Sequence, residues 1–218
     1  MSETDGFIEE VSEELRRDRL FAAFRKYGWI AVLVIFVIVG AAAFREFRLA
    51  QDRNAAQALG DRILAALSED EARGRAEALA AIDAEGSSGA VVLMLRAATA
   101  IEASDPAEAA ALYAEIAEQG DLPARYRDLA ALRRLIILAD SQSAQERIVA
   151  LTPLTAPGAP YRVLAEEQIA LAEIENGDTE AAMSRLQALL NDQEATAGLR
   201  RRASDVIVAL GGTPVVAR

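Results

Sequence analysis

The sequence predicts an all-α protein in which one N-terminal transmembrane helix is followed by an α-solenoid of about four helix pairs and a capping helix. Three observations lead to this prediction. An uncharged apolar run extends from Gly28 to Phe44, the remainder is rich in Ala, Leu, Glu and Arg without period-two alternation, and turn-forming clusters recur at regular spacing. The predicted parts are a cytoplasmic tail (1–26), a transmembrane helix (27–45), an outer helical domain (46–210) and a C-terminal tail (211–218).

The tail combines apolar residues at roughly helical spacing with charged residues between them, in the stretch "FIEEVSEELRRDRLFAAFRKY". This pattern is typical of an amphipathic helix lying on the inner membrane surface. The alternative is that these charges only keep the tail soluble and set the topology.

The apolar run "GWIAVLVIFVIVGAAAF" has 17 residues. At ~1.5 Å per residue it is ~26 Å long, close to the ~30 Å hydrocarbon core of a bilayer. A cleaved signal peptide is the alternative, because Ala41 and Ala43 have the A-x-A spacing of a cleavage site. However, 27 residues precede the run and seven of them are acidic, whereas a signal peptide starts short and basic. We therefore expect an uncleaved anchor.

The orientation follows from the basic residues near the ends of the run, five before it and four after it. Together with a short tail and a long acidic domain, this bias predicts a cytoplasmic N-terminus and an exported C-terminal domain. The span also offers a small-residue face on which it could pack against a membrane complex, formed by Gly40, Ala41, Ala42 and Ala43.

Helical composition continues after the run, and the first helix is expected to extend to about Leu67. Gly211 and Gly212 are expected to cap the last helix. Eight connections, and hence about nine helices, are predicted from clusters at 68–70, 86–89, 104–106, 120–123, 139–143, 155–160, 176–178 and 191–198.

An internal repeat is marked by aspartates in alternate turns, Asp70, Asp105, Asp140 and Asp178, which are 35, 35 and 38 residues apart. A small residue on each helix of a pair would let the two helices approach closely, and a large residue would fill the space between them. The residues in register are Ala97, Leu132 and Ala170 on the first helices, and Ala109, Ala144 and Ala182 with Tyr113, Ile148 and Leu186 on the second.

These units resemble the tetratricopeptide repeat family over roughly residues 50–210. The best copies are "NGDTEAAMSRLQAL" and "SDPAEAAALYAEIAE", while Leu132 and Gly74 depart from the pattern and no unit has the tryptophan near its start. In layout, the tail, "FRKYGWIAVLVIFVIVGAAAFREFR" and the repeats resemble the bacterial inner-membrane family known as the ancillary Sec translocon subunit. That resemblance implies a place beside the protein-export channel, assisting emerging envelope proteins alongside periplasmic chaperones.

The tetratricopeptide resemblance also implies a concave groove lined by the first helix of each pair. Such a mainly apolar groove, with one cation and one anion, suits an extended or partly unfolded polypeptide. The alternative is ordinary packing between neighbouring pairs. The family's groove-lining positions correspond here to Val91, Met94, Tyr126, Leu129, Arg133, Leu164, Glu167 and Leu171.

Composition argues against several function classes. The net charge of −11 disfavours nucleic-acid binding, and the chain has no cysteine, no histidine and a single lysine, Lys26. A serine nucleophile would lack its usual base, and Glu166-Glu167 is the kind of carboxylate pair that normally solvates a helix face. We therefore expect neither an enzyme nor a cofactor or metal site.

The expected function is that of a single-pass inner-membrane protein whose periplasmic solenoid binds other polypeptides, either exported proteins or chaperones, near the export channel. The alternative is a structural or assembly subunit of a respiratory, photosynthetic or division complex in the same membrane.

Overall fold

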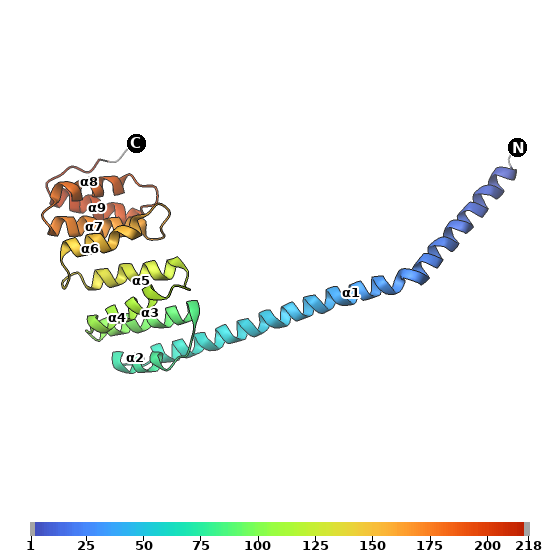
Figure 1. Ribbon diagram of the computed structural model, residues 1–218, viewed down its shortest axis with the longest axis horizontal. Helices are drawn as coiled ribbons and strands as arrows, with labels where there is room; N and C mark the ends of the chain where they lie inside the picture. Colours follow the sequence, from blue (N-terminus) through green and yellow to red (C-terminus); the bar gives the residue numbers. More distant parts are fainter. Residues whose placement is uncertain (1–2, 216–218) are drawn as a thin grey trace. The chain divides into compact units, whose positions relative to one another are not determined.

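The computed structural model describes residues 3–215, with the side chains of residues 25, 26, 29, 30 and 33–215. All regular structure in this part of the chain is helical, which confirms the all-α prediction (Figure 1). The helices are α1 (Glu3–Leu67), α2 (Ala72–Ala80), α3 (Gly86–Glu102), α4 (Pro106–Glu118), α5 (Ala124–Ile137), α6 (Ala144–Leu151), the 3₁₀ turn η1 (Thr152–Thr155), α7 (Arg162–Glu175), α8 (Thr179–Leu190) and α9 (Ala197–Ala209).

The chain divides into two compact units, residues 1–60 and residues 61–218. α1 is one continuous helix that begins in the first unit and ends in the second, at Leu67 as predicted. In the second unit the helices from α2 to α9 pack against their neighbours in chain order. First helices (the end of α1, then α3, α5 and α7) alternate with second helices (α2, α4, α6 and α8), and α9 follows the last pair.

Among the residues with described side chains, no helical segment is both long enough and apolar enough to cross a membrane. The predicted span at 27–45 includes residues 27, 28, 31 and 32, which lie outside that set, so the span stays a prediction. The amphipathic pattern predicted for the tail also falls almost entirely on side chains outside it.

Seven of the eight predicted connections coincide with breaks between helices, but the one at Gly86–Gly89 is wrong. The chain turns at residues 81–85, and Gly86 already begins α3. Gly89 is needed inside the helix because a Cβ there would lie 2.5 Å from the carbonyl oxygen of Ala84. The glycines therefore mark a close approach of the loop to the helix rather than the loop itself.

Three helices end in the same hydrogen-bonded motif, in which the backbone turns left-handed after the last turn. After α7, the Asp178 amide donates to the Glu173 carbonyl at 2.8 Å and Gly177 has φ +89°. The end of α3 repeats this geometry with Ser104, at φ +61°, in place of glycine, and the predicted cap at Gly211-Gly212 ends α9 in the same way. Asp105 then caps α4 by accepting from the Glu108 amide at 2.9 Å.

Equivalent positions in α3–α5 and α7–α9 lie 73 residues apart, so the two halves of the second unit are built on one plan. The terminating motifs of α3 and α7 are in this register, and so are the starts of α5 and α9. The buried pairs in register are Ala97 and Ala170, Ala109 and Ala182, Tyr113 and Leu186, Ile116 and Leu189, Leu122 and Ala195, and Ala130 and Ala203.

The pair formed by α5 and α6 is the exception to this packing. α5 packs mainly on α4, and α6 mainly on α7, while α5 and α6 contact each other little. Ser143 caps α6 through a reciprocal capping box with Glu146, three residues beyond Asp140. In the register of the caps, Arg147 therefore occupies the place of Ala109 and Ala182, and its bulk prevents close approach of the two helices.

We predict that Ala182→Leu will lower the free energy of unfolding by about 1–3 kcal/mol, because Ala182 is fully buried and an added side chain overpacks the interface of α7 and α8. The matched control is Ala181→Leu on the exposed side of the same helix, which should change stability little. Urea unfolding of the two variants measures the difference. Equal stabilities would contradict the close packing described above.

Candidate functional site

The exposed faces of the first helices form the surface that the groove prediction concerns. In each of α3, α5 and α7 the buried residues contact neighbouring helices, and the remaining arc stays exposed. On α3 this arc carries Val91 and Ala98, with the half-buried Leu95 between them. On α7 it carries the exposed Leu171 together with the half-buried Leu164 and Gln168. Both arcs are mainly apolar.

The exposed arc of α5 has a different composition. Arg125, Arg133 and Ile136 are exposed, and Leu129 is half-buried. At ~100° per residue these four positions lie within about 80° of one another. The Arg125 guanidinium also lies over the ring of Tyr126, 4.9 Å from its centroid. We call the exposed arcs of α3, α5 and α7, defined by the residues named in these two paragraphs, the first-helix surface.

The eight residues predicted to line the groove are not equivalent. Met94 and Tyr126 pack partly against the buried cluster of α3, α4 and α5, and Leu164 packs against both clusters that involve α7. Leu171, which is 40% exposed, and Arg133 are open to solvent, while Leu129 is half-buried. The predicted binding role of these residues stays a prediction.

Glu167 has a structural contact that the sequence does not reveal. Its side chain is 9% exposed, and the Arg202 guanidinium of α9 donates to its two oxygens at 2.7 and 2.6 Å. The hydrogen bond to Glu167 raises the pKa of Arg202 above its ordinary value. Glu167 is therefore occupied in holding α9 against α7.

Sequence reasoning also missed Arg125 and Ile136. The signal was present, because Arg125, Leu129, Arg133 and Ile136 follow the i, i+4, i+8, i+11 spacing of one helix face. The predicted groove positions follow from the repeat register, which does not depend on which face of the individual helix is exposed.

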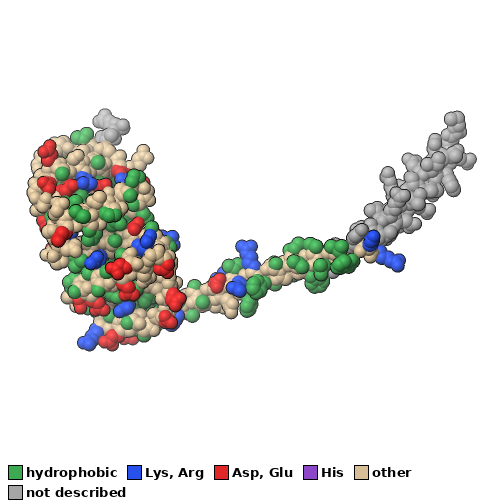
Figure 2. All heavy atoms as spheres, in the orientation of Figure 1, with side chains coloured by type: hydrophobic (Ala, Val, Ile, Leu, Met, Phe, Trp, Pro, Cys, Tyr) green, Lys and Arg blue, Asp and Glu red, His purple; other side chains and the backbone are tan. Residues whose placement is uncertain are grey.

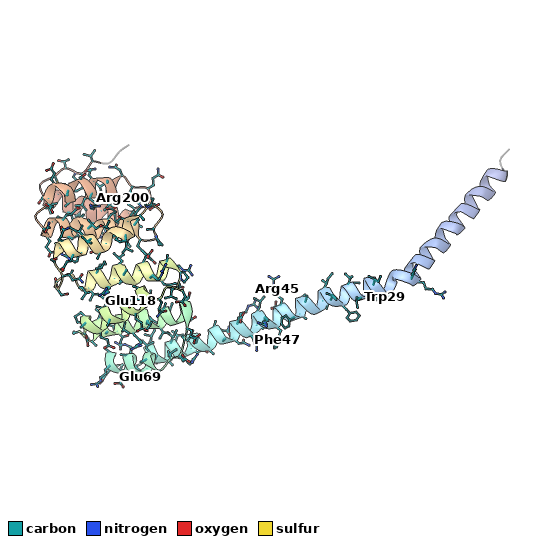
Figure 3. The ribbon with its side chains drawn as sticks, viewed as in Figure 1. Trp29, Arg45, Phe47, Glu69, Glu118 and Arg200 are labelled. Atoms are coloured by element: carbon teal, nitrogen blue, oxygen red, sulfur yellow. The ribbon has the colours of Figure 1, made fainter. Side chains whose placement is uncertain are left out.

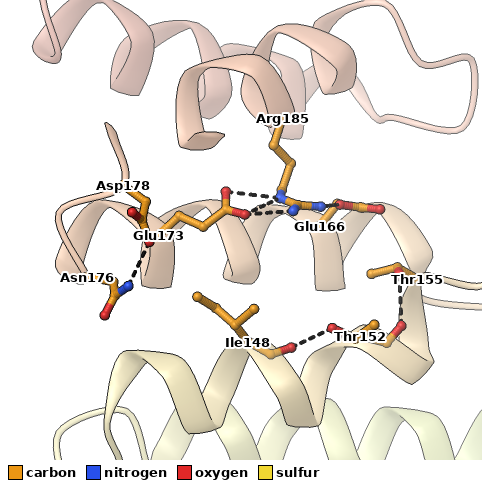
Figure 4. Close-up of polar contacts among 8 residues, drawn as sticks. All are labelled: Ile148, Thr152, Thr155, Glu166, Glu173, Asn176, Asp178 and Arg185. Atoms are coloured by element: carbon orange, nitrogen blue, oxygen red, sulfur yellow. Dashed lines mark hydrogen bonds and ion pairs between the residues drawn. The ribbon is translucent and has the colours of Figure 1, made fainter. Parts of the chain in front are cut away.

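A second ion-pair group joins α7 and α8 (Figure 4). Arg185 of α8 donates to Glu173 at distances down to 2.7 Å and also to Glu166. The hydrogen bond to Glu173 raises the pKa of Arg185 above its ordinary value, although burial of the guanidinium opposes this shift. The predicted solvating pair Glu166-Glu167 is thus divided between two arginines on different helices.

Two further arginines occupy equivalent places in the two halves. Arg75 of α2 reaches Glu102, the last residue of α3, at 2.5 Å, and Arg147 of α6 reaches Glu175, the last residue of α7. Both carboxylates stand at the ends of first helices. Each is paired with an arginine of the second helix that precedes it in the chain.

A cleft of about 720 Å³ lies between α2, α3 and α4 and contains none of the predicted groove residues. Its lining combines apolar side chains such as Leu79 and Leu93 with Arg96 and Glu115. Among the residues that the structure describes, no three carboxylate or other ligating side chains are placed to hold a metal ion.

Comparisons with protein-family models, with curated proteins and with solved structures find no match to this chain. The resemblances to tetratricopeptide repeats and to the ancillary Sec translocon subunit therefore stay predictions.

Asp192 provides a test of how ion pairs stabilise the C-terminal half. Arg162 of α7 donates to both of its oxygens at 3.0 and 2.8 Å. Burial alone would raise the pKa of Asp192, but the hydrogen bonds from Arg162 and from the Glu194 amide bring it below the ordinary value of 3.8. The resulting stabilisation is fully present above that value and is lost as the pH falls through the lower pKa of the folded state.

We predict that Asp192→Asn will lower the melting temperature at pH 7 and that this difference will shrink as the pH falls below the ordinary aspartate pKa of 3.8. Asp205→Asn, which removes an exposed aspartate of α9, should have little effect at either pH. A difference for Asp192→Asn that persists or grows in acid would show that the carboxylate does not act through its charge.

Proposed function

We propose that this chain is a membrane-anchored protein-interaction module, in which part of α1 spans a bilayer and the first-helix surface binds other polypeptides. The observation that carries this proposal is the uncharged stretch of α1 between Trp29 and Phe44, whose described large apolar side chains are all exposed. An apolar surface of this extent on a soluble helix is a liability unless something covers it.

Figure 2 shows hydrophobic side chains gathered along this stretch of α1. Trp29 is 65% exposed and Phe36 is 73% exposed, and Figure 3 shows Trp29, Arg45 and Phe47 as side chains along α1. Basic residues flank the stretch, with Arg25 and Lys26 before it and Arg45 after it. This order of aromatic, apolar and basic residues is that of a helix anchored at both membrane interfaces.

The C-terminal end of the apolar stretch of α1 has a contact suited to a membrane interface. The Arg48 guanidinium lies 5.2 Å from the centroid of the Phe44 ring. An arginine that folds along an aromatic ring can keep its charge at the headgroups while its aliphatic part covers apolar surface. Gly40, Ala41, Ala42 and Ala43 are exposed on the same stretch and would let a neighbouring transmembrane helix approach closely.

The cellular setting proposed is the bacterial inner membrane, with the N-terminus in the cytoplasm and the helical domain in the periplasm. The basic-residue bias supports this orientation. The resemblance in layout to the ancillary Sec translocon subunit supports a place near the protein-export channel, where the clients would be exported proteins or their chaperones.

Binding of polypeptides is supported by the composition of the first-helix surface. Val91, Ile136 and Leu171 are 38%, 40% and 40% exposed and belong to three different first helices. A row of partly exposed apolar side chains, spread over several helices, suits an extended segment better than a compact ligand.

A fixed brace within a membrane complex is the second candidate. It is favoured by the ion pairs that tie α7 to α8 and α9, because Glu167 and Glu173 are buried and each is held by an arginine of another helix. Such contacts restrain the geometry of the C-terminal half. A brace would keep the first-helix surface covered by one constant partner.

The anchor is tested with Phe36→Arg, which places a charge at the centre of the apolar stretch at a cost of about 2.5–3.5 kcal/mol for insertion. We expect the wild-type chain to resist extraction from membranes by alkaline carbonate, and the variant to be partly released. Leu64→Arg is the control, because Leu64 is 67% exposed on α1 but lies outside the stretch. Alkaline phosphatase fused after Arg218 should be active on the wild-type chain, and a cytoplasmic reporter active there would contradict the orientation.

Polypeptide binding is tested by photo-crosslinking of the full chain in cells. The double variant Ile136→Ser and Leu171→Ser should lose most crosslinking to exported polypeptides while its melting temperature stays nearly unchanged, because both side chains are already partly exposed. Val149→Ser, on the second helix α6 and 62% exposed, is the matched control. One constant crosslinked partner, in place of many, would favour the brace.

A further inference from the structure

We infer that the first-helix surface selects extended segments in which an apolar residue is flanked by two acidic residues, one on each side. Arg125 and Arg133 of α5 contact these two acidic residues. This inference rests on the proposed polypeptide-binding function and specifies the partner's chemistry.

α5 and the chain as a whole carry net charges of opposite sign. The whole chain has a net charge of −11, yet α5 carries four arginines and one aspartate. A cationic helix in an acidic protein creates a local attraction for anions that the overall field would otherwise repel.

Two of the four arginines of α5 lie on the first-helix surface. Arg125 and Arg133 lie on the exposed arc of α5, whereas Arg134 lies about 100° further around the helix. Among the described residues, neither Arg125 nor Arg133 has an ion-pair partner, and the carboxylate of α5, Asp128, pairs with neither. Their charges are therefore available to a ligand.

The carboxylates at the ends of α3 and α7 are neutralised by ion pairs. Glu102 and Glu175 end the neighbouring first helices α3 and α7, and they are paired with Arg75 and Arg147. The charges of these two acids are thereby compensated by arginines of the second helices. With both of them paired, the first-helix surface is left cationic along α5 and apolar along α3 and α7.

The spacing of Arg125 and Arg133 matches that of residues i and i+4 in an extended peptide. Arg125 and Arg133 are eight residues apart, which is ~12 Å along a helix, and Leu129 lies midway between them. In an extended peptide, residues i and i+4 are ~13 Å apart and point to the same side as residue i+2. The complementary pattern is therefore acid-x-apolar-x-acid, with the apolar residue on Leu129 and the acids on the two arginines.

The test uses the full chain in mild detergent and fluorescein-labelled peptides, with affinity measured by fluorescence anisotropy at low salt. The probe is SESLSESLSES. The matched controls are SKSLSKSLSKS, which reverses the charge, and SESSSESSSES, which removes the apolar residues. We expect the probe to bind at least about tenfold more tightly than either control, because each control removes one of the two kinds of contact.

Variants of the protein then locate the contact. Arg125→Gln with Arg133→Gln should weaken binding of the probe about 4- to 25-fold, since each exposed pair changes affinity about two- to fivefold. Arg73→Gln with Arg134→Gln removes the same charge from exposed positions off the surface and should change affinity less than twofold. The melting temperatures of both double variants should equal that of the wild-type chain.

Equal binding of either control peptide, equal losses in the two double variants, or no binding of any peptide would each overturn the inference. The crosslinking experiment with Ile136→Ser and Leu171→Ser separates this failure from that of the proposed function. If those variants still lose crosslinking, polypeptide binding stands and only the acidic preference is wrong. If they do not, the binding function fails as well.

Discussion

The second unit depends on the close approach of paired helices at alanine. Ala97 faces the interface of α3 and α4, Ala170 that of α7 and α8, and both are fully buried. Since these interfaces hold no bulky side chain at the closest point, Tyr113 and Leu186 can fill the space beyond it. The same arrangement at an interval of 73 residues gives the unit two similar halves. The exposed arc of each first helix is the surface that such packing leaves over.

The junction between the halves shows what happens when this constraint is relaxed. Leu132 and Leu135 on α5 and Arg147 on α6 replace the alanines, and the two helices contact each other little. Leu132 and Leu135 instead join a cluster with α6, η1 and α7. Among the described side chains, the buried polar atoms without a hydrogen bond are the Nε atoms of Arg127 and Arg147 and Oε1 of Gln142, all near this junction. An unsatisfied buried polar group weakens packing, so these atoms weaken the junction further.

Much of this architecture could be predicted from the sequence, because helix breaks and small-residue positions are local signals. The end of α1 at Leu67 and the buried pair Ala109 and Ala182 were recoverable in this way. The start of α6 was harder to predict from the sequence, because Asp140 and Ser143 are both good N-cap residues. Only the capping box with Glu146 decides between them. Glu167 could not be understood from local pattern at all, because its partner Arg202 is 35 residues away and is brought close only by the fold.

The arginines of the second unit have two different roles that composition alone does not reveal. Most arginines of the second unit that form ion pairs hold one helix to another, as Arg75, Arg147 and Arg185 do. Ordering the side chains of such pairs costs conformational entropy, and exposed pairs stabilise the fold little. Their main effect is to fix the positions of the helices relative to one another. The exposed arc of α5 differs because Arg125 and Arg133 have no ion-pair partner among the residues that the structure describes. A net charge of −11 therefore describes the chain but not the surface that a polypeptide would meet.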